Sequence, residues 1–485
     1  MLTFTQINLH KAAQAMMLVG RGMEGSKQSI TLMTEPYTFD NKVAGLPRGT
    51  RAVYARQGGV SPRACIVSSM DVKLTAMDNW CRRDCAVALA RIGGAQTIIV
   101  SLYLDITLEV QPDWLDNLMH MINGKNYPII MGMDSNAHST MFGPTNNARG
   151  AALEDFILQY GLNVENFGNV PTFEIIRGAN HVKTYIDVTL TRDLPVSVQD
   201  WHVCQDYNAS DHNTILFQVQ NKGQEPELVR PWSRADWKVF EEELKCASYD
   251  IPKDMSMKKL DKLVTKIYRI LEAALDKACP RVSHDTKVGK SHWATEKHDQ
   301  EKSKVNALYR AAKKSGSQEA WQQYKEADKK FKRMCRIDKN KAWRKYKECI
   351  QSEKEMAQLA KSAQWEERRD INVLTRPDGS STDPGTETIN LLTETHFPAA
   401  TDTKHVTYNN RRNLSVEDIQ GKYKDWIDKQ KIKSALAGFE KKKSPGPDGL
   451  KPLIFEHFPD ELITCLSYTS PSPRDRQKSR MPSSA

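Results

Sequence analysis

The chain has 485 residues, a formal net charge of +10 at neutral pH and a pI near 9.0. This length predicts more than one domain, and the excess of basic residues favours a polyanionic partner, nucleic acid ahead of a membrane surface. Nine cysteines without a repeated spacing argue against a disulfide framework or a paired zinc site, so reduced thiols in an intracellular protein are expected. Neither a signal peptide nor an apolar run of the roughly 18 residues that span a bilayer is expected.

Short strands with a few helices between them are predicted over the first 220 residues. The strands are expected at residues 3–9, 30–34, 53–56, 65–69, 85–92, 97–104, 127–131, from 171, 184–191, 196–204 and 214–219. Helices are expected to follow residue 12 and to cover 113–122 and 153–160. This alternation predicts a layered α/β sandwich.

One buried strand ends at Gly132, which is expected to let the chain turn, and Asp134, Asn136 and His138 follow at once. A carboxylate, an amide and an imidazole are thus delivered together at the end of a core strand, where open α/β folds place ligand sites. The same residues also fit an Asx-rich turn that caps a helix beginning near Ala151. The segment alone does not separate these two interpretations.

Polar residues follow other strands in the same way, from distant parts of the chain. They are Asn8, Glu35, Tyr103, Asp134, Asn136, Asp187, Asp211 and His212. Their order, and the boxes at residues 132–138, 185–190 and 210–212, resemble the endonuclease/exonuclease/phosphatase superfamily, and within it the endonuclease domain of non-LTR (LINE-type) retrotransposons. The resemblance covers about residues 2–220 and implies a sandwich of two β-sheets flanked by helices. Met133 departs from the acidic or polar residue that is common in the box.

The resemblance implies hydrolysis of a phosphodiester with Mg²⁺, and Mn²⁺ is an alternative cofactor. Glu35 is expected to be the main metal ligand, assisted by Asn8, Asp211 and Asp134. Oxygen ligands of this kind suit a hard cation that keeps several of its waters.

The same resemblance implies the catalytic roles. Asp134 is expected to act as general base or to orient the attacking water, and Asn136 to fix water or phosphate. His212 is expected to donate to an oxygen of the scissile phosphate, while Asp187 holds its other ring nitrogen. Tyr103 is expected near the phosphate, as a donor or, if ionised, as an aid to the leaving group.

Four further residues are assigned lesser parts. Thr172 and Ser210 are expected to contact the phosphate, and His10 and His138 to lie at the periphery of the site. With them, every expected site residue lies in a predicted endonuclease domain over residues 1–222.

The composition changes over residues 223–385, where Lys, Arg, Glu and Gln dominate and a mostly helical basic connector is predicted. Long polar helices are expected at 302–314 and 319–347. One interpretation is a solvated spacer. The other is an arm that grips RNA or DNA, with basic residues on the phosphates.

Residues 386–465 are interpreted as the truncated start of a reverse transcriptase domain, because residues 441–455, with Ser-Pro-Gly-Pro-Asp-Gly at 444–449, resemble its opening box. No Asp-Asp pair follows residue 450, so polymerase activity is not expected from this chain. Residues 466–485 look like adapter, vector or frameshifted sequence rather than a packed element.

The implied function is a DNA endonuclease that nicks double-stranded target DNA and leaves a 3′-OH from which reverse transcription starts. Element RNA is a further expected partner through the basic connector, and no membrane partner is expected. The expected location is the nucleus, for access to the target, and the cytoplasm before import. The alternatives are an abasic-site repair endonuclease, another phosphodiesterase or phosphatase of the same fold, and a catalytically idle fragment that binds nucleic acid.

Overall fold

The computed structural model describes residues 1–469 except 27, 57–58, 178–179, 222–227, 250–256, 284–287, 289–292, 364–373, 375, 379, 381, 383–385, 397–428, 442 and 444–448. The chain forms two compact units, one from residues 1–225 with 285–402 and the other from 226–284 with 403–485. The boundary between the units therefore falls inside the range predicted as one connector. Residues 444–448 of the polymerase-like box and 470–485 of the tail lie outside the described residues.

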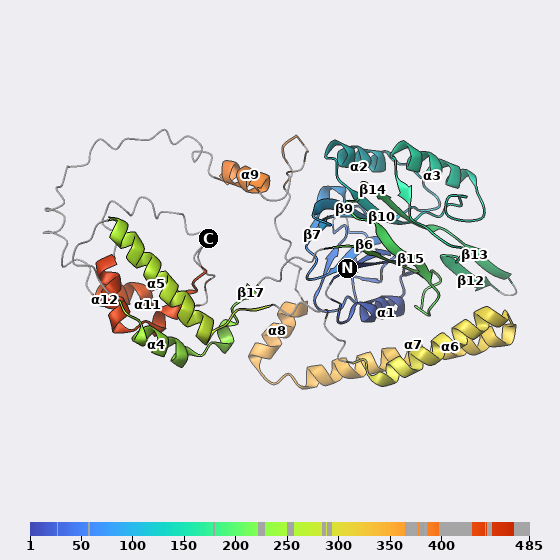
Figure 1. Ribbon diagram of the computed structural model, residues 1–485. Coiled ribbons are helices and arrows are strands. Elements are labelled where there is room, and N and C mark those ends of the chain that lie inside the picture. The colour runs from blue at the N-terminus through green and yellow to red at the C-terminus, as the bar shows by residue number, and fades with distance from the viewer. Residues whose placement is uncertain are drawn as a thin grey trace. The chain divides into compact units, whose positions relative to one another are not determined.

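Two six-stranded sheets form the body of the first unit (Figure 1). The strand order of the first sheet is β15 (Val198–Cys204), β16 (Thr214–Val219), β1 (Leu2–Asn8), β2 (Ser29–Thr34), β6 (Ala64–Ser69) and β5 (Thr50–Val53). The order of the second is β11 (Asn163–Val164), β14 (Asp187–Arg192), β10 (Ile129–Asp134), β9 (Ala95–Tyr103), β8 (Cys85–Ile92) and β7 (Leu74–Ala76). The pairs β1–β2 and β9–β10 are parallel and the other pairs within these sheets are antiparallel.

The first unit also contains α-helices and two short hairpins. They are α1 (Ala13–Met23), α2 (Asp113–Gly124), α3 (Ala148–Gln159), α6 (Glu296–Ser315), α7 (Gln318–Glu348), α8 (Glu353–Ala363), α9 (Thr386–His396), β3 (Thr38–Phe39) with β4 (Lys42–Val43), and β12 (Phe173–Arg177) with β13 (Asn180–Thr184). Apolar residues of α2 and α3 pack on the second sheet and those of α1 on the first. This arrangement confirms the predicted layered sandwich of two sheets flanked by helices.

A smaller, mainly helical core makes up the second unit. Its described elements are α4 (Trp237–Cys246), α5 (Met257–Ala278), α11 (Lys429–Ala437), α12 (Asp460–Thr469), two 3₁₀ helices (Trp232–Arg234 and Pro452–His457) and the pair β17 (Leu228–Val229) and β18 (Val282–Ser283). Phe240, Leu275, Ile454 and Leu462 are fully buried in this core. None of the described helices in either unit combines the length and the apolar composition needed to cross a membrane.

The two large sheets approach closely at Gly132. The sequence had suggested a turn at this residue, but Gly132 lies inside β10. A Cβ built on Gly132 would lie 2.6 Å from Leu32 Cδ1 and 2.8 Å from Gln6 Oε1. The Gln6 amide nitrogen in β1 donates to the carbonyl oxygens of Met133 (3.3 Å) and Val188 (3.2 Å), which ties the sheets together beside the candidate site. Glycine is thus required here for close packing, and β10 continues through Asp134.

We therefore expect Gly132→Ala to destabilise the protein by about 1–3 kcal/mol, because the new methyl group must displace packed side chains of the facing sheet. Urea unfolding measures this change. Gly22→Ala is the matched control, since Gly22 lies in α1 with nothing within 4 Å of its built Cβ. The control should stabilise the helix by about 0.5–1 kcal/mol. Equal effects of the two substitutions would contradict the close-packing explanation.

Candidate active site

Two buried carboxylates meet at the end of the second sheet. Asp134 is the last residue of β10 and Asp187 the first of β14, and the antiparallel register pairs them directly. The parallel register of β9 and β10 places Tyr103 opposite Asp134 on the other side. Both aspartates are only 2% exposed, so the strand ends hold their charges away from bulk solvent. The short polar segments after separate strands are therefore brought together, as the sequence predicted.

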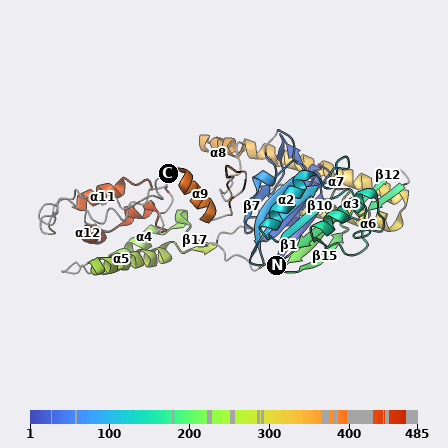
Figure 2. The same ribbon diagram turned by 90° about the horizontal axis from the view of Figure 1, so that it is seen from above.

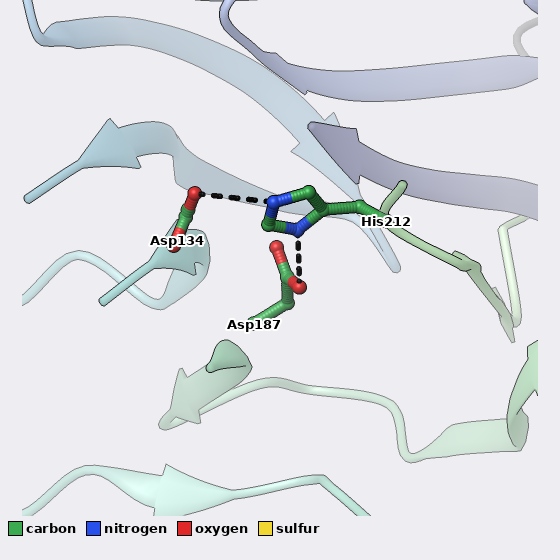
Figure 3. Close-up of side chains that lie close together, drawn as sticks. All are labelled: Asp134, Asp187 and His212. Atoms are coloured by element: carbon green, nitrogen blue, oxygen red, sulfur yellow. Dashed lines mark hydrogen bonds and ion pairs between the residues drawn. The ribbon is translucent and has the colours of Figure 1, made fainter. Parts of the chain in front are cut away.

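His212 lies between the two carboxylates (Figure 3). Its Nδ1 is 2.8 Å from Asp187 Oδ2, and its Nε2 is 4.0 Å from Asp134 Oδ2. The Phe173 ring packs against the imidazole in a T-shaped arrangement, with centroids 4.9 Å apart. The pairing of Asp187 with His212 has the geometry that was expected, and it fixes which ring nitrogen points toward Asp134.

The electrostatics of this group favour a charged imidazole. Burial by itself lowers the pKa of His212, but the charge and hydrogen bond of Asp187 outweigh it and raise the pKa to about 9. Burial, and then the neighbouring charge of Asp187, raise the pKa of Asp134 to about 7. Asp134 is thus a carboxyl group that can exchange a proton near neutral pH, and a cation bound beside it would lower its pKa again.

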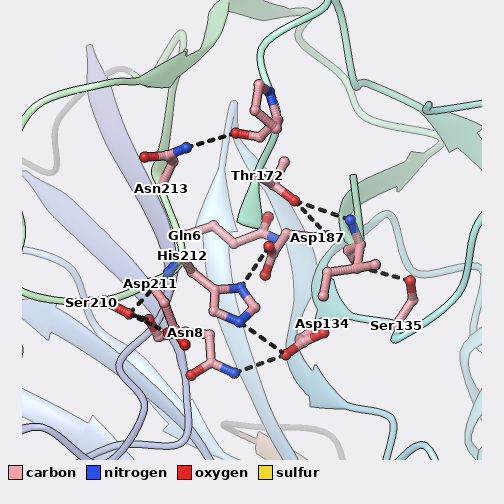
Figure 4. A network of polar contacts seen from close by, with 12 residues as sticks. Gln6, Asn8, Asp134, Ser135, Thr172, Asp187, Ser210, Asp211, His212 and Asn213 are labelled. Atoms are coloured by element: carbon pink, nitrogen blue, oxygen red, sulfur yellow. Dashed lines mark hydrogen bonds and ion pairs between the residues drawn. The ribbon is translucent and has the colours of Figure 1, made fainter. Parts of the chain in front are cut away.

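Asn8, at the end of β1, joins the two sheets at the site (Figure 4). Its amide nitrogen donates to Asp134 Oδ2 at 2.8 Å, and its amide oxygen accepts from the backbone N–H of His10 at 2.7 Å. The Ser210 hydroxyl donates to the Asn8 carbonyl oxygen at 2.7 Å. The imidazole of His10 lies 3.5 Å from a carboxylate oxygen of Asp211. Four residues from opposite ends of the domain thereby share one network.

Glu35 and Tyr103 lie at the same edge. Glu35 follows β2 with a φ of 44°, and the Lys11 ammonium is 3.3 Å from its carboxylate. Burial, and then the charges of Glu35 and Asp134, raise the pKa of Tyr103 to about 12. Tyr103 is therefore protonated at neutral pH, which makes it a hydrogen-bond donor rather than a phenolate. The Arg63 guanidinium stacks 4.6 Å from its ring centroid and holds it in place.

The remaining predicted residues have structural partners. The Asn136 amide donates to the Leu104 carbonyl oxygen at 3.0 Å. The Thr172 hydroxyl oxygen accepts from the backbone N–H groups of Ile186 (3.1 Å) and Asp187 (3.0 Å), so it braces the strand that carries Asp187. His138 is turned toward Thr145, 3.2 Å away, in agreement with its expected peripheral place. Contacts of Asn136, Thr172 and Ser210 to phosphate remain predictions.

Sequence reasoning missed the residues that hold the site's loops. Arg149 donates to four carbonyl oxygens, those of Leu104, Asp105, Leu108 and Ser135, and so fixes the loops after β9 and β10. Arg63 forms a bidentate pair with Asp84 and also contacts Asp105 at 2.5 Å. Both arginines act on segments that are distant in sequence, and no local pattern marks them.

The donor set at this edge suits a hard divalent cation. Among the described residues, Asp134, Asp187 and His212 offer ligand atoms that all lie within 4.8 Å of one another. Carboxylate oxygens predominate there, and the amide of Asn8 lies against Asp134. Such oxygens are the ligands that Mg²⁺ prefers, and a protonated His212 would serve the phosphate rather than the metal. Glu35 and Asp211, the other expected ligands, already pair with cationic or titratable neighbours.

Comparisons with known proteins address the origin of this site. Residues 97–216 match the family model described as "Endonuclease-reverse transcriptase". A 115 kDa protein in the type-1 retrotransposable element R1DM of Drosophila melanogaster is 24% identical over 316 residues, which span 61% of this chain and 30% of that protein. Among solved structures, the endonuclease domain of TRAS1, a telomere-specific non-LTR retrotransposon, is 26% identical over 46% of this chain and 100% of that one, with a TM-score of 0.40.

A second solved structure, an AP endonuclease from Leishmania major, is 13% identical over 45% of this chain and 88% of that one, with a TM-score of 0.36. The range matched by the family model includes Tyr103, Asp134, Asp187 and His212, the residues that the structure brings together. The chain therefore contains an endonuclease/exonuclease/phosphatase domain of the kind found in non-LTR retrotransposons.

Proposed function

We propose that this protein is a Mg²⁺-dependent DNA endonuclease of a non-LTR retrotransposon, which nicks target DNA and leaves a 3′-OH for target-primed reverse transcription. The observation that carries the proposal is the buried group of Asp134, Asp187 and His212, with the Asp187–Nδ1 contact of 2.8 Å that holds His212 charged and oriented. Nucleic acid as the substrate agrees with the net charge of +10.

The geometry supports a separate role for each site residue in this reaction. Asp134 takes a proton from the attacking water as the general base. His212 donates Nε2–H to a nonbridging phosphate oxygen, and Tyr103 donates its hydroxyl proton to a hydrogen bond with the phosphate. The water oxygen bonds to phosphorus as the P–O3′ bond breaks, and the leaving 3′ oxygen takes a proton from solvent to become the 3′-OH, so that a 5′-phosphate remains on the other side of the nick. Mg²⁺, held by Glu35, Asn8 and Asp211, would supply charge neutralisation of the phosphate and the leaving oxygen.

The test is incubation of the whole chain with supercoiled plasmid, with Mg²⁺, with Mn²⁺ and with EDTA. We expect open circles in the presence of either metal and none with EDTA, because the site's carboxylates and the phosphate need a neutralising cation. Extension of the nicks by a DNA polymerase without prior end repair checks for the 3′-OH. Intact plasmid in all three incubations would overturn the proposal, and cleavage confined to depurinated plasmid would point to abasic-site repair instead.

The part of the proposal that concerns the rest of the chain is narrower. Residues 386–465 are proposed to be the start of a reverse transcriptase domain, without polymerase activity of their own. Target DNA is the proposed partner, and the nucleus the proposed site of action. Agreement between the DNA sequence nicked in vitro and the genomic sites of integration would support target DNA as the partner.

A further inference from the structure

The basic helices α6 and α7 belong to the same unit as the endonuclease domain, and both views place α6 beside the β12–β13 hairpin (Figures 1 and 2). Tyr207, in the loop between β15 and β16, is 3% exposed. Its ring packs against Tyr309, Tyr324 and Phe331 of the two helices, with centroids 6.1–6.4 Å apart. Its hydroxyl bonds to Asp328. The helices therefore pack on the loop that carries His212.

Charged contacts continue this packing toward the site. The Glu174 side chain, 5% exposed, contacts Lys313 of α6 and lies 2.6 Å from His181 Nε2. Lys313 also lies 3.5 Å from Asn213 Oδ1, next to His212. The backbone N–H of Glu174 donates to the Asp211 carbonyl oxygen at 2.8 Å. One hydrogen bond thus separates the Glu174–Lys313 pair from the segment that carries Asp211 and His212.

A cavity of about 670 Å³ opens at this junction, between α6 and the segments at Pro171, β13 and β15. Four lysine or arginine side chains and two carboxylates line it, which gives a net charge of +2. Glu174 is paired with Lys313, and Asp206 with Arg310. Lys314 is exposed and has no ion-pair partner among the described residues, and Lys183 reaches Glu174 only at 3.8 Å. Lys314 therefore remains to bind an anion, and Lys183, which is only at the limit of ion-pair distance from Glu174, is the second candidate cation.

We propose that this cavity binds a backbone phosphate of the target DNA strand next to the cleaved phosphodiester, with Lys314 and Lys183 as its cations. The proposal rests on the proposed function. A DNA strand carries one phosphate per roughly 3.4 Å of helix axis, so a strand whose scissile phosphate lies at His212 presents further phosphates to nearby surfaces. Pro171, at the cavity, directly precedes Thr172, which braces Asp187. The basic helices therefore extend the DNA-binding surface of the endonuclease and are not a detached spacer.

The experiment measures duplex DNA binding by the whole chain over a range of salt concentrations, in Ca²⁺ or EDTA so that no turnover is needed. The slope of log K against log salt is negative, and Lys314→Gln and Lys183→Gln should each reduce its magnitude by about 0.9, the value for one lost phosphate contact. Lys314→Arg should keep the slope. Lys341→Gln, a matched change on the exposed surface of α7 outside the cavity, should leave it unchanged.

In the nicking assay, Lys314→Gln and Lys183→Gln should raise KM and leave kcat unchanged, because neither lysine contacts the reacting group. A Lys314→Gln slope equal to that of Lys341→Gln would overturn the proposal, and so would a change seen with single-stranded RNA but not with duplex DNA. The two hypotheses fail separately. A chain that shows the slope changes but leaves plasmid intact contradicts the nuclease and keeps the phosphate site, and a chain that nicks with unchanged slopes does the reverse.

Discussion

Asp187→Asn and His212→Ala should each lower the nicking rate by roughly two to four orders of magnitude, the usual range for a positioned proton donor. Asp187 Oδ2 lies 2.8 Å from His212 Nδ1, and it sets both the orientation and the charge of the imidazole. If Asp187 acts only through His212, the double variant should be no slower than His212→Ala alone, because coupled groups are not additive. Single-turnover rates with saturating protein measure this cycle.

Matched controls separate this effect from a general loss of structure. Asp200→Asn and His120→Ala change the same residue types at exposed positions, on β15 and α2, and should retain the full rate. DNA affinity should be largely kept in both site variants. A double variant that loses the full sum of the two single effects in free energy would show that the side chains act independently, and the proposed pairing would then be wrong.

Glu35→Gln should change the dependence on metal rather than proton transfer. Glu35 follows β2 at the edge that carries Asp134 and Tyr103, and its carboxylate is the proposed main ligand. We expect the Mg²⁺ concentration for half-maximal nicking to rise by at least the roughly 10–100-fold that loss of a supporting group costs a metal site. Titration of the nicking rate with Mg²⁺ measures the change directly.

Glu109→Gln is the control, since Glu109 is an exposed glutamate in the segment between β9 and α2. A Glu35→Gln variant that is slower at every metal concentration, with an unchanged midpoint, would remove Glu35 from the ligand set. It would leave the assignment of His212 and Asp187 untouched.

The sequence predicted the strands of the site but missed their ends by about three residues, because polar residues mark only roughly where an apolar run stops. Asp134 was expected just after a strand and Asp187 inside a strand at 184–191, whereas the structure ends β10 at Asp134, begins β14 at Asp187 and pairs the two residues in one antiparallel register. Gly132 was misassigned, because a glycine that permits a turn and one that admits a facing sheet look alike in sequence. The difference depends on Leu32 and Gln6, more than 90 residues away.

The packing of α6 and α7 on the endonuclease domain was not predicted. Their composition is polar, and only a few residues such as Val305, Trp321 and Phe331 are buried. Val305 and Phe331 pack in one cluster with Tyr207, which itself lies in a loop rather than in a periodic element. Trp321 packs against Tyr309 and Tyr324 beside that cluster. Long-range pairs such as Lys313 with Glu174 depend on the folded topology and leave no local signal.

The residues that bury Tyr207 are translated much later than Tyr207 itself, which has a consequence for the nascent chain. The residues that enclose Tyr207, up to Phe331, leave the ribosome more than 100 residues after Tyr207 itself. At about 5–20 residues per second this delay lasts roughly 6–25 s, and through that time the nascent nuclease exposes an aromatic surface. Chaperone binding or proteolysis at this loop should therefore be confined to ribosome-bound chains, and cease once α7 has been released.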